Sequence, residues 1–200
     1  MIPIIGIILR DENYRKMTIN KEVLEAVNSL GATPIGIYPT NIDLFIDFCD
    51  GFILQGGDSF TNFDLDLVSK LYKLNKPLLG ICLGMQTMGY FFNGKLNKCK
   101  NHKSEENYVH KVNIIKGTLL HKILNKTSIL VNSRHNDCIE CTNLNISAIS
   151  DDGIIEAVED SHHKFFLGIQ WHPETIMDEN SKLIFQNFID ACKGEKWVKK

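Results

Sequence analysis

The sequence has no long apolar run. Residues 1–9 are mostly apolar, but a membrane-spanning helix needs about 20 such residues in succession. The segment also lacks the positively charged start that opens a secretory signal peptide. We therefore interpret it as a buried first β-strand and expect the protein to lie in the cytoplasm.

The chain has little excess of either charge. It carries 22 Lys and Arg side chains against 24 Asp and Glu, which gives a formal net charge of −2. Proteins that bind nucleic acid or anionic membranes usually present a strongly basic surface. We therefore expect neither nucleic acid nor a membrane as a partner, and favour a small-molecule substrate.

Paired cysteine motifs are also missing. Cys138 and Cys141 have C-x-x-C spacing, but the sequence has no second C-x-x-C that would complete a zinc site. The six cysteines are scattered along the chain, a distribution that favours reduced thiols in a cytosol over a disulfide framework. We expect no metal at this motif.

The sequence contains no linker, internal repeat or low-complexity segment. Its apolar fraction of 44% and charged fraction of 23% are ordinary for a globular domain. We therefore expect residues 1–200 to form a single domain.

Strand and helix patterns alternate through the first half of the chain. Short apolar runs of strand type are separated by segments with apolar residues at helical spacing. The runs lie at residues 1–9, 33–37, 51–54 and 78–81. This order predicts a parallel sheet with helices on both faces.

The second half of the chain has a different pattern. Strand-like segments follow one another with short turns between them, at residues 109–115, 128–132, 146–150, 154–159 and 165–171. A helix is predicted to close the chain near residues 184–192. We expect this half to extend the sheet with antiparallel strands.

A cysteine lies between the fourth strand and the helix that follows it. Gly80, Cys82 and Gly84 form G-x-C-x-G, the thiol counterpart of the G-x-S-x-G nucleophile elbow. Glycines let the strand and the helix approach closely, while the turn exposes the sulfur at a helix N-terminus, which favours the thiolate. The alternative is a small buried cysteine packed behind the turn.

A histidine and a glutamate follow the last predicted strand. The segment from Phe165 ends in His172-Pro173-Glu174. Because side chains two apart on a strand share a face, we expect His172 and Glu174 to project to the same side. A cysteine, a histidine and a carboxylate together follow the logic of a catalytic triad.

These motifs resemble those of the class I glutamine amidotransferase superfamily. Within it the chain is most similar to the branch of gamma-glutamyl hydrolases and gamma-glutamyl-gamma-aminobutyrate hydrolases. The segments that carry the resemblance are Gln55-Gly-Gly-Asp58, Gly80 to Gln86, Val131 to His135, Asp152-Gly-Ile-Ile-Glu156-Ala and Gly168 to Glu174. The resemblance implies a flavodoxin-like α/β sandwich with a mostly parallel central sheet, a nucleophile elbow and an antiparallel extension.

The resemblance also implies roles for individual residues. Cys82, His172 and Glu174 would be the catalytic triad, and the backbone N–H groups of Gly57 and Leu83 would form the oxyanion hole. The segment that contacts the glutamyl part of the substrate would comprise Gln86, Ser133, Arg134 and His135. This scheme requires no cofactor and no metal.

Three classes of function fit such a site. The first is a stand-alone hydrolase that releases glutamate and an amine from a gamma-glutamyl compound. The second is a glutaminase subunit that passes ammonia to a separate synthetase partner, and the third is a stress or redox factor with a cysteine elbow. The presence of both His172 and Glu174 argues against the third. The residues of the segments that begin at Gln55 and Asp152 favour the hydrolase. Such a hydrolase could also assemble as a homo-oligomer.

Two further histidines flank a polar loop after the nucleophile helix. His102 and His110 correspond to loop histidines that related proteins often carry near the mouth of the site. A role in gating or binding is one interpretation, and the other, which we favour, is a solvated loop.

Overall fold

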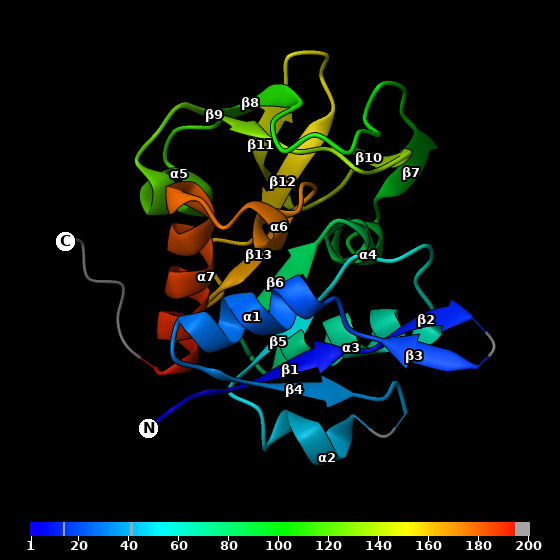
Figure 1. Ribbon diagram of the computed structural model, residues 1–200, viewed down its shortest axis with the longest axis vertical. Coiled ribbons are helices and arrows are strands. Elements are labelled where there is room, and N and C mark those ends of the chain that lie inside the picture. The colour runs from blue at the N-terminus through cyan, green and yellow to red at the C-terminus, as the bar shows by residue number, and fades with distance from the viewer. Residues whose placement is uncertain (14, 41, 195–200) are drawn as a thin grey trace.

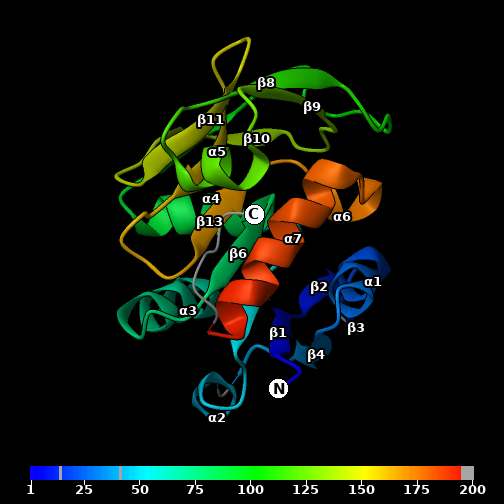
Figure 2. The same cartoon turned by 90° about the vertical axis from the view of Figure 1, so that its left-hand side faces the viewer.

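The fold is built on one large sheet with helices on both faces (Figures 1 and 2). The computed structural model describes residues 1–13, 15–40 and 42–194. Five neighbouring strands of this sheet run parallel. In spatial order they are β4 (Thr33–Ile37), β1 (Ile4–Ile8), β5 (Gly51–Leu54), β6 (Leu78–Ile81) and β13 (Phe166–Ile169).

The second half of the chain continues the sheet with antiparallel pairing. Beyond β13 the order is β12 (Ile155–Glu159), β11 (Asn145–Ser150), β8 (His110–Ile114) and β9 (Ser128–Val131). A branch at β12 adds β10 (Asp137–Cys141) and β7 (Lys95–Lys98). This extension forms the upper part of Figure 1. The predicted division into a parallel half and an antiparallel extension is confirmed.

Alternating side chains along the parallel strands create two separate cores. Leu79 and Ile81 of β6 contribute to one apolar cluster, whereas Leu78 contributes to the other. This two-residue period is what a strand covered on both faces requires. The apolar runs of the sequence therefore fix which face each side chain occupies.

Helices cover both cores. The first core is covered by α1 (Lys21–Ser29), α5 (Leu119–Leu124) and α7 (Glu179–Cys192). The second is covered by α2 (Asp43–Ile46), α3 (Asn62–Lys73) and α4 (Leu83–Phe91). Figure 2 shows α1 and α3 on opposite sides of the parallel strands. A short α6 (Pro173–Ile176) packs between α1 and α7.

Several short elements were not predicted. A separate hairpin of β2 (Arg10–Asn13) and β3 (Lys16–Thr18) follows β1, and β7 and β10 pair at the edge of the extension. Their sequences are mostly polar and lack the apolar alternation of a half-buried strand. Such strands are held by backbone pairing, which leaves little trace in the sequence.

The elbow glycines allow α4 to lie directly against the sheet. A Cβ on Gly80 would lie 2.5 Å from Met88 Sδ and 2.8 Å from the carbonyl carbon of Gly84. A Cβ on Gly84 would overlap the carbonyl oxygen of Leu54 in β5. The close approach expected from the G-x-C-x-G pattern is therefore present, and it places Cys82 at the end of β6.

Among the described residues, no helix combines the length and the apolar character needed to cross a membrane.

Replacement of Gly84 by alanine should destabilise the protein by about 3 kcal/mol or more, because the added methyl group meets rigid backbone. Gly36→Ala is the matched control, since its Cβ would meet the Cδ1 end of the Ile19 side chain, which can rotate away. We expect the control to cost about 1 kcal/mol or less. Urea denaturation of both variants measures the difference, and equal losses would contradict the role assigned to Gly84.

Candidate active site

Cys82 lies on a strained turn at the carboxyl end of β6. Its backbone has φ 52° and ψ −105°, and it occupies the N-cap position of α4. Non-glycine residues in such sparsely populated regions cost about 1–3 kcal/mol, and they cluster at functional sites. The turn is held by a 2.8 Å hydrogen bond from the Cys82 N–H to the carbonyl of Ile169 in β13. The predicted elbow is therefore present, with its thiol 7% exposed.

His172 and Glu174 lie in contact, but they are not on a strand as predicted. Strand β13 ends at Ile169, and His172 is the N-cap of α6, in which Pro173 and Glu174 form the first turn. The prediction of a shared strand face is wrong because proline at the first helical position favours a helix start here. The helical turn nevertheless places Glu174 Oε1 2.7 Å from His172 Nδ1.

Asn132, which the sequence analysis did not identify, holds the backbone of His172. Its Oδ1 accepts a hydrogen bond from the His172 N–H at 2.8 Å, and its Nδ2 donates to the His172 carbonyl at 2.9 Å. Asn132 is fully buried directly after β9. Its position within the segment Val131 to His135 could have drawn attention to Asn132. Nothing in the sequence, however, indicated that its partner would be His172, 40 positions away.

The imidazole of His172 lies between the Glu174 carboxylate and the Cys82 thiol. Burial disfavours its charged form, but the negative charge of Glu174 and a hydrogen bond with the Cys82 thiol outweigh burial and raise the pKa of His172 to about 10. At neutral pH the ring is therefore a positively charged imidazolium, with a proton on both nitrogens. This arrangement suits an ion pair between an imidazolium and a thiolate.

The predicted oxyanion donors lie beside this pair. A Cβ on Gly57 would come within 3.1 Å of Leu83 Cδ2, so the two predicted residues adjoin. The preceding Gly56 lies under His172 and Cys82, since its Cβ would be 2.9 Å from His172 Cε1 and 3.7 Å from the Cys82 Cβ. Glycine at this position lets the strand end pass beneath the imidazole.

Gln55 anchors the glycine turn to its surroundings. Its Nε2 donates to the carbonyls of Ile8 and Thr18 at 2.9 and 3.0 Å, and its Oε1 accepts from the Asn20 N–H at 2.9 Å. A further contact comes from Arg10 Nε, 3.4 Å from the Gln55 carbonyl. The sequence identified Gln55 only as part of a motif, whereas the structure shows that its amide ties β5 to β1 and to the β2–β3 hairpin.

The predicted substrate-binding side chains make mainly internal contacts. Gln86 Nε2 donates to the Asp137 carbonyl at 2.8 Å and to Gln170 Oε1 at 3.2 Å. Ser133 Oγ donates to the His102 carbonyl at 2.7 Å. Gln170, another residue that the sequence analysis missed, also places its Nε2 3.5 Å from Cys82 Sγ.

The two remaining members of the predicted pocket segment lie next to Ser133. The backbone of Arg134 pairs with the backbone of Lys103 in an isolated antiparallel β-bridge. His135 is buried, and burial lowers its pKa to about 4 despite the nearby Glu156 carboxylate. The segment 133–135 therefore borders the site as a firmly held wall.

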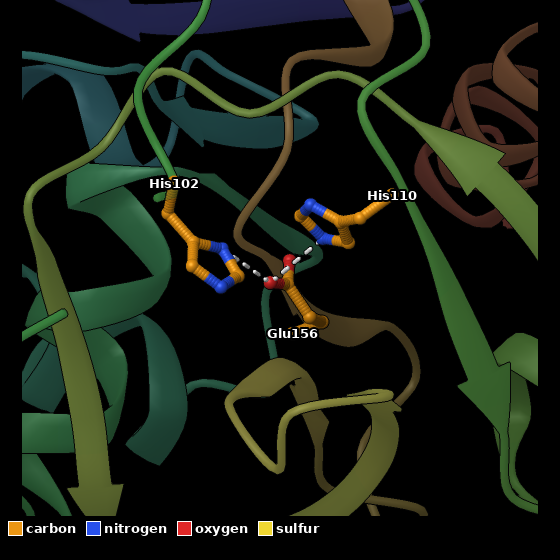
Figure 3. Close-up of side chains that lie close together, drawn as sticks. All are labelled: His102, His110 and Glu156. Carbon is orange, nitrogen blue, oxygen red and sulfur yellow. Dashed lines mark hydrogen bonds and ion pairs between the residues drawn. The ribbon is translucent and has the colours of Figure 1, made fainter. Parts of the chain in front are cut away.

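The preferred interpretation of His102 as part of a solvated loop is wrong. Its side chain is 3% exposed, and its ring nitrogens lie 3.4 Å from Glu156 Oε1 and 3.0 Å from Asp152 Oδ2. His110 is also held, with its Nε2 3.1 Å from Glu156 Oε1 (Figure 3). The carboxylate that draws both rings inward lies some fifty positions further along the chain, so spacing alone did not reveal it.

Comparison with known proteins places this site within a family. The family model described as Peptidase C26 matches residues 59–174, a range that includes Cys82, His172 and Glu174. The chain belongs to the peptidase C26 family. This assignment and the relatives place it in the class I glutamine amidotransferase superfamily, as the sequence motifs indicated.

Relatives of known sequence include hydrolases and a synthase. The gamma-glutamyl-gamma-aminobutyrate hydrolase of Escherichia coli strain K12 is 27% identical over 238 residues, covering 96% of this chain and 94% of that protein. The glutamine-hydrolysing GMP synthase of Dictyostelium discoideum is 34% identical over 180 residues, covering 78% of this chain. This chain spans only 24% of that synthase.

A solved structure confirms the fold. The glutaminase domain of Trypanosoma brucei CTPS with bound acivicin superposes with a TM-score of 0.74, covering 98% of this chain and 96% of that one. The two sequences are 19% identical. The predicted α/β fold with a mostly parallel sheet and flanking helices is therefore confirmed.

Cys82 should be alkylated before the other cysteines near neutral pH. Burial raises the pKa of Cys49 to about 11 and that of Cys99 to about 12, and it also raises the pKa of Cys138 and Cys192. Cys82 instead hydrogen-bonds with a charged imidazole. Brief treatment with substoichiometric iodoacetamide, followed by mass mapping, measures the order of labelling.

Cys141 provides the control for this experiment, because it is exposed but lies on β10 without a histidine partner in the described part of the chain. Cys141→Ser should leave the labelling of Cys82 unchanged. Preferential labelling of Cys141 in the unmodified protein would contradict the assignment of the nucleophile.

Glu174→Gln should reduce the free energy of unfolding more at pH 6 than at pH 10. The pKa of His172 is about 10 in the folded protein and about 6.5 in an unfolded chain. Its stabilising pairing is therefore complete below about pH 6.5 and is lost as the pH rises through about 10. Urea denaturation at both pH values measures the difference, with His162→Ala on an exposed turn as control. A loss of equal size at both pH values would show that Glu174 does not act through the charge of His172.

Proposed function

We propose that this protein is a stand-alone cysteine hydrolase that cleaves the gamma-glutamyl amide bond of a small gamma-glutamyl compound. The products are glutamate and an amine, and the intermediate is a glutamyl thioester on Cys82. The observation that carries the proposal is that one chain already holds the His172 imidazole in contact with both the Cys82 thiol and the Glu174 carboxylate.

The first half of the reaction transfers the glutamyl group to sulfur. The Cys82 thiolate attacks the side-chain carbonyl carbon, and the C=O π electrons move onto oxygen. The N–H groups of Gly57 and Leu83 donate to this oxyanion. The tetrahedral intermediate then expels the amine, to whose nitrogen His172 gives its proton, and the thioester remains.

The second half returns the enzyme to its starting state. His172, now neutral, takes a proton from water as the water oxygen attacks the thioester carbonyl. Collapse of this second intermediate breaks the C–S bond, releases glutamate and restores the thiolate beside the imidazolium. Glu174 holds the proton on Nδ1 and stabilises the charged ring in both halves, at the 2.7 Å contact.

The glutamyl portion would lie against the wall formed by Gln86 and residues 133–135. Because the side-chain donors of Gln86 and Ser133 bond to the protein itself, we assign recognition in this segment chiefly to backbone groups. The amine portion would face the opening next to the Gly57 turn, which is exposed. No cofactor enters this scheme.

The second candidate is a glutaminase subunit that delivers ammonia to a separate synthetase. The likeness to the glutamine-hydrolysing GMP synthase favours it. The match to the Escherichia coli gamma-glutamyl-gamma-aminobutyrate hydrolase, which spans 94% of that protein, supports the hydrolase. A subunit would also need a means of silencing its site until its partner binds, whereas the contacts described here are formed in the isolated chain.

The purified chain should hydrolyse a gamma-glutamyl amide without any partner, with kcat/KM on the order of 10⁴ M⁻¹s⁻¹ or better. A panel containing gamma-glutamyl-gamma-aminobutyrate, other substituted amides and glutamine measures this by glutamate release. A substituted amide should be the better substrate, because contacts with the amine portion can stabilise the transition state. Cys82→Ala should abolish turnover, and Cys141→Ala should preserve it.

The opposite outcome would identify the subunit. Glutamine would then be the best substrate, its turnover would be very slow, and an added or co-purifying synthetase would raise the rate many-fold. That result would overturn the proposal of a stand-alone hydrolase while leaving the roles of Cys82 and His172 unchanged.

A further inference from the structure

A second group of histidines surrounds a buried carboxylate in the antiparallel half. Figure 3 shows His102 on the loop before β8 and His110 at the start of β8, both directed at Glu156 of β12. Glu156 is fully buried. One ligand atom from each of the three side chains lies within 4.8 Å of the other two. None of the three takes part in the proposed reaction.

Two buried polar atoms in this group lack a hydrogen-bond partner among the described residues, namely Glu156 Oε2 and His135 Nε2. His135 is 5% exposed, and its Nδ1 lies 3.0 Å from the Asp137 carbonyl oxygen. Since only an N–H can bond to a carbonyl, Nδ1 carries the proton and Nε2 of the neutral ring is an acceptor. That Nε2 lies 3.9 Å from Glu156 Oε1. One oxygen of the buried Glu156 carboxylate and the nearby ring nitrogen of His135 therefore lack donors, a deficit that a bound cation would relieve.

Hydrogen bonds around the group orient its rings as a metal site requires. His102 Nε2 lies 3.0 Å from Asp152 Oδ2, and the other oxygen of Asp152 accepts from Ser150 Oγ. Histidines that bind metals usually donate their second ring N–H to a carboxylate or a backbone carbonyl. His102 and His135 both show this pattern.

We propose that His102, His110 and Glu156 bind a divalent transition-metal ion of the zinc class, beside the buried Nε2 of His135. Zinc lies about 2.0–2.1 Å from nitrogen and oxygen ligands, so neighbouring donors of a tetrahedral site are separated by about 3.3–3.4 Å. The separations from Glu156 Oε1 are 3.4 Å to His102, 3.1 Å to His110 and 3.9 Å to His135. These values bracket the ideal separation. A set of imidazoles with one carboxylate is typical of zinc.

The ion would be structural and would fix one wall of the active site. The carbonyl of His102 accepts hydrogen bonds from Ser133 Oγ at 2.7 Å and from the His135 N–H at 2.9 Å. The carbonyl of Glu156 accepts from the N–H of Gln170, whose side chain reaches Cys82. A metal at this point joins the loop, β8 and β12 behind residues 133–135. The proposal does not depend on which substrate the enzyme cleaves.

Zinc titration of the metal-stripped full chain tests the site. Cys82→Ala serves as the background, so that the nucleophile cannot bind the metal, and a chromophoric chelator competes for Zn²⁺. We expect one equivalent of Zn²⁺ per chain, and a Co²⁺ spectrum in the visible region typical of tetrahedral nitrogen and oxygen ligands. Glu156→Gln and His110→Ala should each weaken binding by about 100-fold or more.

Two neighbouring aspartates provide a matched comparison. Asp152→Asn should weaken binding about 10- to 100-fold, because it removes the carboxylate that orients His102. Asp151→Asn should leave binding unchanged, since Asp151 is exposed and bonds to Asn113 and Lys111 instead. This pair keeps the test decisive even where Glu156→Gln fails to fold.

Three results would overturn the proposal. The first is that Cys82→Ala binds Zn²⁺ no more tightly than the same protein with Asp152→Asn. That result would mean that hydrogen bonds alone, without a metal, hold the histidines around Glu156. Loss of binding in Cys138→Ala or Cys141→Ala, with Asp152→Asn unaffected, would place the metal at the C-x-x-C motif. Equal weakening by the two aspartate variants would show that general surface charge, and not the orientation of His102, controls binding.

Discussion

The close contact between α4 and the sheet is the constraint on which the active site depends. Gly84 lies against the backbone of β5, and Gly80 lies under α4, so the helix starts at once after β6. At this abrupt change of direction Cys82 adopts a positive φ of 52°. Its position is set from two sides, by the helix that begins after it and by its hydrogen bond to β13. The free-energy cost of this strained backbone is offset by packing that lies outside the site.

Both halves of the sheet use the same chemical device. At the end of the parallel half a buried carboxylate, Glu174, holds one histidine against Cys82. In the antiparallel half Glu156 gathers two further histidines around itself. A buried carboxylate without a compensating charge is costly, so the histidines beside each glutamate also help to keep it inside the protein. Gln170 lies between the two groups, bonded to the Glu156 carbonyl through its backbone and to Cys82 through its side chain.

The sequence was sufficient for those parts of the site that local pattern controls. Strand runs and glycine spacing predicted the parallel sheet and the elbow at Cys82, because both follow from backbone sterics over a few residues. The pairing of His172 with Glu174 was predicted, although the prediction of a strand was wrong and a proline-initiated turn forms instead. The environment of His102 could not be predicted, since its burial depends on Glu156, which the long-range pairing of β8, β11 and β12 brings close to it. The same holds for Gln55, whose amide bonds to three distant backbone groups.

The two hydrogen bonds between Asn132 and the backbone of His172 have a consequence for the movement of charge. They reproduce with a side chain the paired exchange that two antiparallel strands make with their peptide groups. The backbone of His172 is thereby fixed whether its ring is charged or neutral. In the proposed reaction a proton leaves the ring once and returns once in each turnover while the peptide frame stays in place, so the protein needs little reorganisation around it. In this sense Asn132 serves the reaction without touching any atom that reacts.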